Sequence, residues 1–157
     1  MKALDQEQVS PESGLRPRAS DRVKVGAGEL VWNALRQEDY LLDFNRLLGK
    51  QTQWSVAYAV CYIQSDAAQA GVVMKVGSDE EAKICLNGKE IYRNEIARAC
   101  VPDQDEVMGI ELRAGLNVLV FKVVNEILAW QGSVRFTDAA GQPLKGIRVT
   151  LDPEAKD

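Results

Sequence analysis

Trp130 and the polar residues near it have the side chains best suited to binding a ligand by stacking and hydrogen bonds. An indole ring packs against the face of a sugar ring, and amide or guanidinium groups beside it bond the hydroxyls. Asn125 and Gln131 lie close to Trp130 in the sequence, and Arg93 and Asn94 end another apolar run. We expect these residues to line one ligand surface. The alternatives are that Trp130 caps the core and that Arg93 forms local ion pairs.

The other two tryptophans are weaker candidates for the same role. Trp54 stands next to Gln51 and Gln53, so it has amide groups close by but again has the alternative of capping the core. Trp32 alternates with Leu30 in an apolar run, a pattern that favours a core position.

Asp79 and Glu80 belong to an acidic stretch, residues 78–81, that has a second possible chemistry. Their carboxylate oxygens are ligands of the kind that Ca²⁺ takes, in sets of about six to eight. Lys75 and Lys83 flank the stretch, and the spacing alone does not make the carboxylates converge. The alternatives are a Ca²⁺ site and a solvated turn whose charge the lysines offset; no other cofactor is expected.

Catalysis is not expected, because the chain has no histidine. Ser-His-Asp and Cys-His mechanisms and His-ligated zinc are thereby excluded. Cys61, Cys85 and Cys100 are odd in number and lack C-x-x-C spacing, so a disulfide framework or zinc site is not predicted. A glycosidase with two opposed carboxylates is a further alternative, but no acidic pair in the sequence points to one.

The bulk composition predicts neither a nucleic-acid partner nor a membrane span. A formal charge of −4 over 157 residues gives no electrostatic reason to expect nucleic acid. No apolar run approaches the roughly 20 residues of a membrane span. The polar start, MKALDQEQVSPESG, has no apolar signal-peptide region, so no secretory signal is predicted in this chain, and its compartment is unknown.

Short apolar runs separated by turn residues predict an all-β fold. The expected strands are residues 29–35, 55–63, 70–76, 82–86, 89–92, 105–112, 116–124, 129–138 and 146–151, with a short helix within 39–49 ended by Gly49. Asn87-Gly88 predicts a type I′ hairpin turn, because both central residues of that turn need positive φ. Lys122 alternates with apolar neighbours and is expected to extend its amine to solvent.

The chain is therefore divided into three parts. Residues 1–27 carry Pro, Gly and many charges with little periodicity, which is typical of a polar tail or linker. Residues 28–152 are the predicted antiparallel β-sandwich, and residues 153–157 form a C-terminal tail.

Several motifs resemble the galactose-binding-like jelly-roll domains that occur as carbohydrate-binding accessory modules in large bacterial secreted proteins. They are VAYAVCYIQSD (56–66), VGSDEEAKICLNGKEIYRN (76–94), PDQDEV (102–107), LRAGLNVLVFKV (112–123) and AWQGSVRFTDAAGQPL (129–144). The sequence departs from the family pattern at Glu80 and Glu81, where Asp and Gly are usual, and at Cys85 and Leu116, where aromatic residues are usual.

The resemblance implies a jelly-roll-like sandwich that binds carbohydrate without catalysis, as part of a larger extracytoplasmic protein. A structural or protein-interaction module that packs against neighbouring domains and binds no sugar is the alternative. An exposed tryptophan would favour the first function, and burial of all three would favour the second.

Overall fold

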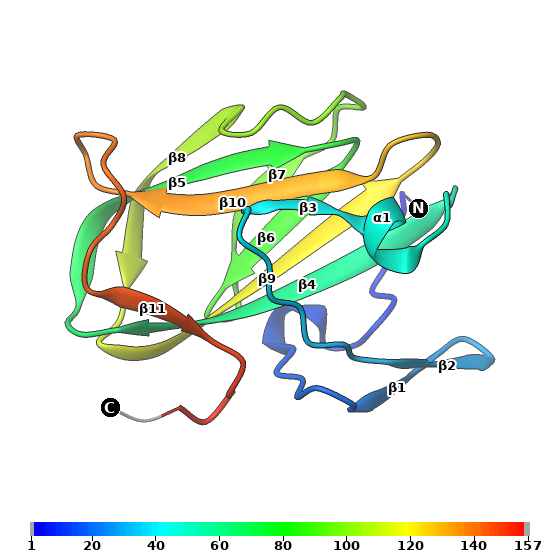
Figure 1. Cartoon of the computed structure of the whole chain (residues 1–157), viewed down its shortest axis with the longest axis horizontal. Helices are drawn as coiled ribbons and strands as arrows, with labels where there is room; N and C mark the ends of the chain where they lie inside the picture. The colour runs from blue at the N-terminus through cyan, green and yellow to red at the C-terminus, as the bar shows by residue number, and fades with distance from the viewer. Residues whose placement is uncertain (1, 156–157) are drawn as a thin grey trace.

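Two antiparallel sheets face each other across one core, with a small hairpin beside them (Figure 1). The computed structural model describes residues 2–155. The five-stranded sheet has the order β11-β4-β9-β6-β7, and the four-stranded sheet has the order β3-β10-β5-β8. The predicted all-β sandwich is confirmed.

The strand bounds follow the apolar runs of the sequence. The five-stranded sheet contains β4 (Ser55–Ser65), β6 (Ala82–Leu86), β7 (Lys89–Asn94), β9 (Gly115–Asn125) and β11 (Ile147–Thr150). The four-stranded sheet contains β3 (Leu41–Asp43), β5 (Gln69–Ser78), β8 (Asp105–Leu112) and β10 (Gln131–Thr137). The hairpin pairs β1 (Arg22–Val25) with β2 (Gly28–Val31). Within residues 2–155, no helix has the length and apolar character needed to cross a membrane.

Local turn chemistry positions the connections as the sequence predicts. Asn87 and Gly88 have φ of 52° and 85°, so the β6–β7 hairpin turns through two left-handed residues. The short helix α1 (Phe44–Leu48) begins after Asp43, whose carboxylate accepts a hydrogen bond from the Arg46 amide at 3.0 Å. Gly49 ends the helix with φ of 65°.

Strand β4 is apolar on both faces because each face is covered. Ala57, Ala59, Cys61 and Ile63 pack into the core between the sheets. Its larger side chains, Tyr58, Val60 and Tyr62, point to the opposite face and form a second apolar cluster with residues of β6 and β9. An apolar outer face on a sheet needs a cover, and the N-terminal residues provide it.

Residues 2–17, here called the N-terminal strap, lie across the outer face of the five-stranded sheet (Figure 1). Leu4, Val9 and Glu12 are buried, and Leu15 packs against the second cluster. The hydroxyl of Tyr62 donates a hydrogen bond to the Pro17 carbonyl at 2.6 Å. This packing differs from the polar tail or linker expected at residues 1–27.

The C-terminal residues also contact the rest of the chain. Pro153 is buried, and Glu154 pairs with Arg18 at 2.7 Å. Of the tail expected at 153–157, residues 156 and 157 lie outside the described residues.

Gly132 lets β10 approach the core aromatic Phe121. A Cβ added at Gly132 would lie 2.6 Å from Cε1 of Phe121. We expect Gly132→Ala to lower the free energy of unfolding by about 1–3 kcal/mol, because the packed core must shift to accept the methyl group. Urea denaturation measures the change. Gly28→Ala is the control, since its Cβ would meet its nearest neighbour at an ordinary 3.6 Å; equal effects of the two substitutions would contradict the packing argument.

Candidate functional site

Trp130 is a core residue. Its side chain is 4% exposed, and its ring centroid lies 5.1 Å from that of Phe44. The indole Nε1 donates a hydrogen bond to the Val123 carbonyl at 3.3 Å. Because both ring faces are inside the protein, Trp130 caps the core and does not present a stacking surface, which corrects the first expectation for this residue.

Two of the amide side chains expected around Trp130 are also buried. Asn125 donates from Nδ2 to the Thr52 carbonyl at 2.7 Å. Asn94 donates to the carbonyls of Glu80 and Ile96, both at 2.9 Å. These amides bind the backbone of neighbouring loops, so they hold loops in place and are closed to a ligand in this structure.

The remaining two residues of the predicted surface bond to carboxylates. Gln131 is half-buried and donates to Oδ2 of Asp43 at 3.2 Å. Arg93 contacts Glu90 and Asp5 at 2.8 Å each and Glu95 at 3.2 Å, and hydrogen bonds to these carboxylates, Glu90 first, raise its pKa. The local ion pairs given above as the alternative are therefore what the structure shows for Arg93, and the predicted surface is not assembled.

Asp79 and Glu80 lie in an acidic environment. Burial, followed by the nearby carboxylate of Asp43, raises the pKa of Asp79. Burial, followed by Glu126 and then by Asp79, raises the pKa of Glu80. Among residues 2–155, no group of three or more His, Cys, Asp or Glu side chains is placed to hold a metal ion. The Ca²⁺ hypothesis therefore finds no coordinating group in the part of the chain that is described.

Trp54 is the tryptophan that the fold presents to solvent. Its side chain is 75% exposed, directly before the first residue of β4. Its backbone has φ of 50°, and its amide donates to the Glu126 carbonyl at 2.9 Å, which fixes the residue against the β9–β10 loop. Trp54 was the weaker candidate from the sequence, because nothing in its local pattern distinguishes an exposed indole from a buried one.

The loops beside Trp54 are held by side-chain amides. Asn45 of α1 donates to the Leu128 carbonyl at 2.8 Å, and its Oδ1 accepts from the Thr52 amide at 2.9 Å. Gln51 also donates to the Leu128 carbonyl, at 3.4 Å. We call Trp54, Gln51, Gln53 and Glu126 the Trp54 surface. It combines an exposed ring with amide and carboxylate groups at one end of the five-stranded sheet.

The fold and this surface define a β-sandwich domain with an aromatic group at the end of one sheet. No protein-family model matches the chain, and no curated protein matches it. Among solved structures, it is similar to the structure of a family 35 carbohydrate-binding module from an environmental isolate. The two share 20% identity over 64% of this chain and 76% of the other, with a TM-score of 0.43. Because this identity and this TM-score are low, the fold is described from the strands of the present chain alone.

Proposed function

We propose that this domain is a non-catalytic carbohydrate-binding module and that the Trp54 surface is its binding site. The observation that carries the proposal is the 75% exposure of the Trp54 ring. A large aromatic side chain left in water forgoes the stabilisation it would gain by burial, and contiguous exposed apolar surface commonly marks a site of interaction.

The chemistry of the surface suits a sugar. The apolar face of a pyranose packs on an indole, and the exposed amides of Gln51 and Gln53 and the carboxylate of Glu126 can bond hydroxyl groups. The hydrogen bond that Asn45 donates to Leu128 and the one that it accepts from Thr52 tie it to both adjoining loops and support a preformed surface. A preformed site loses less conformational entropy on binding.

Trp54→Ala is expected to weaken binding of the best sugar ligand by about tenfold, because an aromatic contact contributes roughly 0.5–1.5 kcal/mol beyond its area. A glycan array would select the ligand, and titration calorimetry would measure its affinity. Trp54→Phe should keep most of the binding. Tyr40→Ala, at an aromatic residue that is 44% exposed outside the Trp54 surface, is the matched control. Absence of binding at millimolar sugar, or an affinity unchanged in Trp54→Ala, would contradict the proposal.

One observation favours the second candidate function, a module that packs against a neighbouring domain. Exposed apolar side chains gather near Trp54, with Ile127 at 45% and Leu128 at 64% exposure. Protein contact would cover such residues, whereas a sugar would contact mainly the ring. Leu128→Ser separates the functions, since it should disturb a protein interface while leaving stacking on Trp54 in place.

A further inference from the structure

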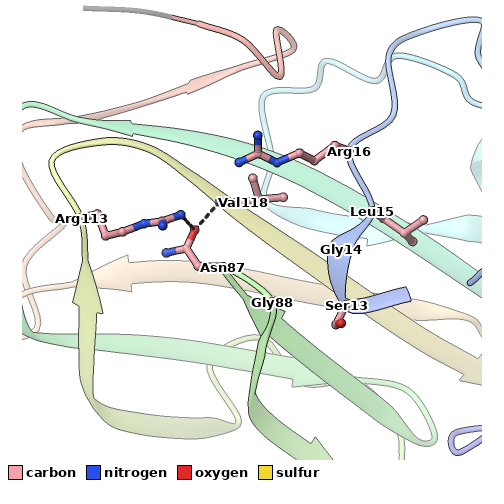
Figure 2. A pocket seen from close by; sticks show the side chains of 8 residues that line it. All are labelled: Ser13, Gly14, Leu15, Arg16, Asn87, Gly88, Arg113 and Val118. Atoms are coloured by element: carbon pink, nitrogen blue, oxygen red, sulfur yellow. Dashed lines mark hydrogen bonds between the residues drawn. The ribbon is translucent and has the colours of Figure 1, made fainter. Parts of the chain in front are cut away.

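A cavity of about 180 Å³ lies between the N-terminal strap and the turn that joins β6 to β7 (Figure 2). Residues 13–16 of the strap form one wall. Asn87, Gly88, Arg113 and Val118 form the other. The cavity therefore exists only while the strap is docked on the sheet.

The cavity is basic although the whole chain has a net charge of −4. Its lining contains Arg16 and Arg113 and no Asp or Glu. Within residues 2–155, neither arginine belongs to an ion pair, whereas six others do: Arg18, Arg22, Arg93, Arg98, Arg135 and Arg148. Figure 2 shows the two side chains extending toward each other over Val118. Two like charges on one cavity attract an anion.

Arg113 is held in place by a network of side-chain amides. Its Nη2 donates to Oδ1 of Asn87 at 2.8 Å, and the same oxygen accepts from the Val118 amide at 3.0 Å. Nδ2 of Asn87 in turn donates to Oδ1 of Asn117 at 2.8 Å, and Asn117 is fully buried. The remaining guanidinium N–H groups are left free of these bonds, in a planar arrangement that matches the oxygens of an oxyanion.

We propose that this cavity binds a small oxyanion, phosphate or sulfate, between Arg16 and Arg113. Its volume of about 180 Å³ is below the roughly 300–1,000 Å³ of sites for drug-sized ligands, and it equals the space of about six liquid waters. The anion is either free in solution or the end group of a larger molecule, since both present the same charged oxygens to the arginines.

The bound anion would also fasten the strap. Arg16 belongs to the strap and Arg113 to the turn before β9, so an oxyanion that contacts both joins the two parts. A ligand that binds only the docked form stabilises that form by mass action.

This proposal is independent of sugar binding at Trp54. Ser55 pairs with Asn125 at one end of β4, and Ile63 pairs with Asn117 near the other. These positions are separated by about 26 Å along the strand. Failure of one proposal therefore leaves the other unaffected.

The test is calorimetric titration of the whole chain with sodium phosphate and sodium sulfate, against sodium chloride at matched ionic strength. We expect saturable binding of phosphate, sulfate or both, with a Kd of millimolar or lower. Arg113→Gln and Arg16→Gln should each weaken it at least tenfold. Arg113→Lys should weaken it less than Arg113→Gln, because it keeps the charge but loses the planar group.

Arg36→Gln is the matched control, since Arg36 is exposed and forms no ion pair within residues 2–155. Tighter binding of glucose 6-phosphate than of inorganic phosphate would identify an end group, and the reverse order would identify the free ion; glucose alone should not bind here. The proposal is overturned if phosphate and sulfate act no differently from chloride, or if Arg36→Gln weakens binding as much as the cavity substitutions. If Arg113→Gln fails to fold, Arg16→Gln on the strap decides the outcome.

Discussion

Glu12→Gln is expected to lower the free energy of unfolding by about 3–5 kcal/mol, although the residue lies in a segment whose composition is that of a polar tail. Glu12 belongs to the N-terminal strap and is 4% exposed. Its carboxylate pairs with Nζ of Lys83, accepts a hydrogen bond from Nζ of Lys122 at 3.0 Å, and accepts another from the Tyr58 hydroxyl at 2.8 Å.

The size of the effect comes from the two lysines. Lys122 is 1% exposed, and its Nζ also donates to the carbonyls of Leu4 and Gln6 at 3.0 and 2.6 Å. A glutamine at position 12 keeps the shape of the side chain but removes its negative charge. Both ammonium groups would then be buried without a counter-charge, which is far more costly than loss of an exposed pair.

Urea denaturation at neutral pH measures the change. Glu29→Gln is the matched control, because Glu29 pairs with Arg22 at 2.6 Å on the surface and should change stability by less than about 1 kcal/mol. Hydrogen exchange of the strap amides should rise in Glu12→Gln and not in Glu29→Gln. Equal stabilities of the two variants would show that the buried charges are dispensable.

The difference in free energy of unfolding between the wild-type chain and Glu12→Gln should depend on pH, and the direction of that dependence follows from the pKa of Glu12. Burial alone would raise the pKa of Glu12, but hydrogen bonds from Lys83, Lys122 and Tyr58 outweigh burial and lower it below its usual value of 4.5. A carboxyl with a lowered pKa in the folded state stabilises that state above its unfolded pKa, and the contribution is lost as the pH falls through the folded pKa. The difference in free energy of unfolding between the wild-type chain and Glu12→Gln should therefore be largest near neutral pH and become smaller in acid.

The strap explains why part of the fold was predictable and part was not. The strands were predicted because alternation of apolar residues is local to each strand, and the Asn87-Gly88 turn because its φ values depend on those two residues. The strap depends on contacts with no local signal: Glu12 meets Lys83 and Lys122, which are 71 and 110 residues away. For the same reason Lys122, expected to reach solvent, is buried.

Prediction of the candidate site was limited in the same way, by contacts between residues that are distant in the sequence. The sequence pointed to tryptophans with amide neighbours, but it favoured Trp130, which is buried, over Trp54, which is exposed. The burial of Trp130 depends on Phe44 of α1, which is distant in the sequence and packs on its ring. The basic cavity was missed because Arg16 and Arg113 come together only when the strap docks; the isolated Asn87-Gly88 motif predicts the turn but not the arginine that Asn87 positions.

Trp130→Ala is expected to lower the free energy of unfolding by about 3–5 kcal/mol, because it removes a large buried ring and leaves a cavity beside Phe44. Trp54→Ala should change stability by less than about 0.5 kcal/mol, since its ring is 75% exposed. Thermal and urea unfolding of both variants measure the contrast.

For sugar binding we expect the opposite order: Trp54→Ala should have the large effect and Trp130→Ala the small one. At a temperature where Trp130→Ala remains folded, its affinity for the ligand of the wild-type chain should be close to normal, whereas Trp54→Ala should lose most of its affinity. Each tryptophan therefore serves as the control for the other, in stability and in binding. Loss of binding in Trp130→Ala with unchanged stability would move the stacking surface back to Trp130 and show that the core around Phe44 opens to admit a ligand.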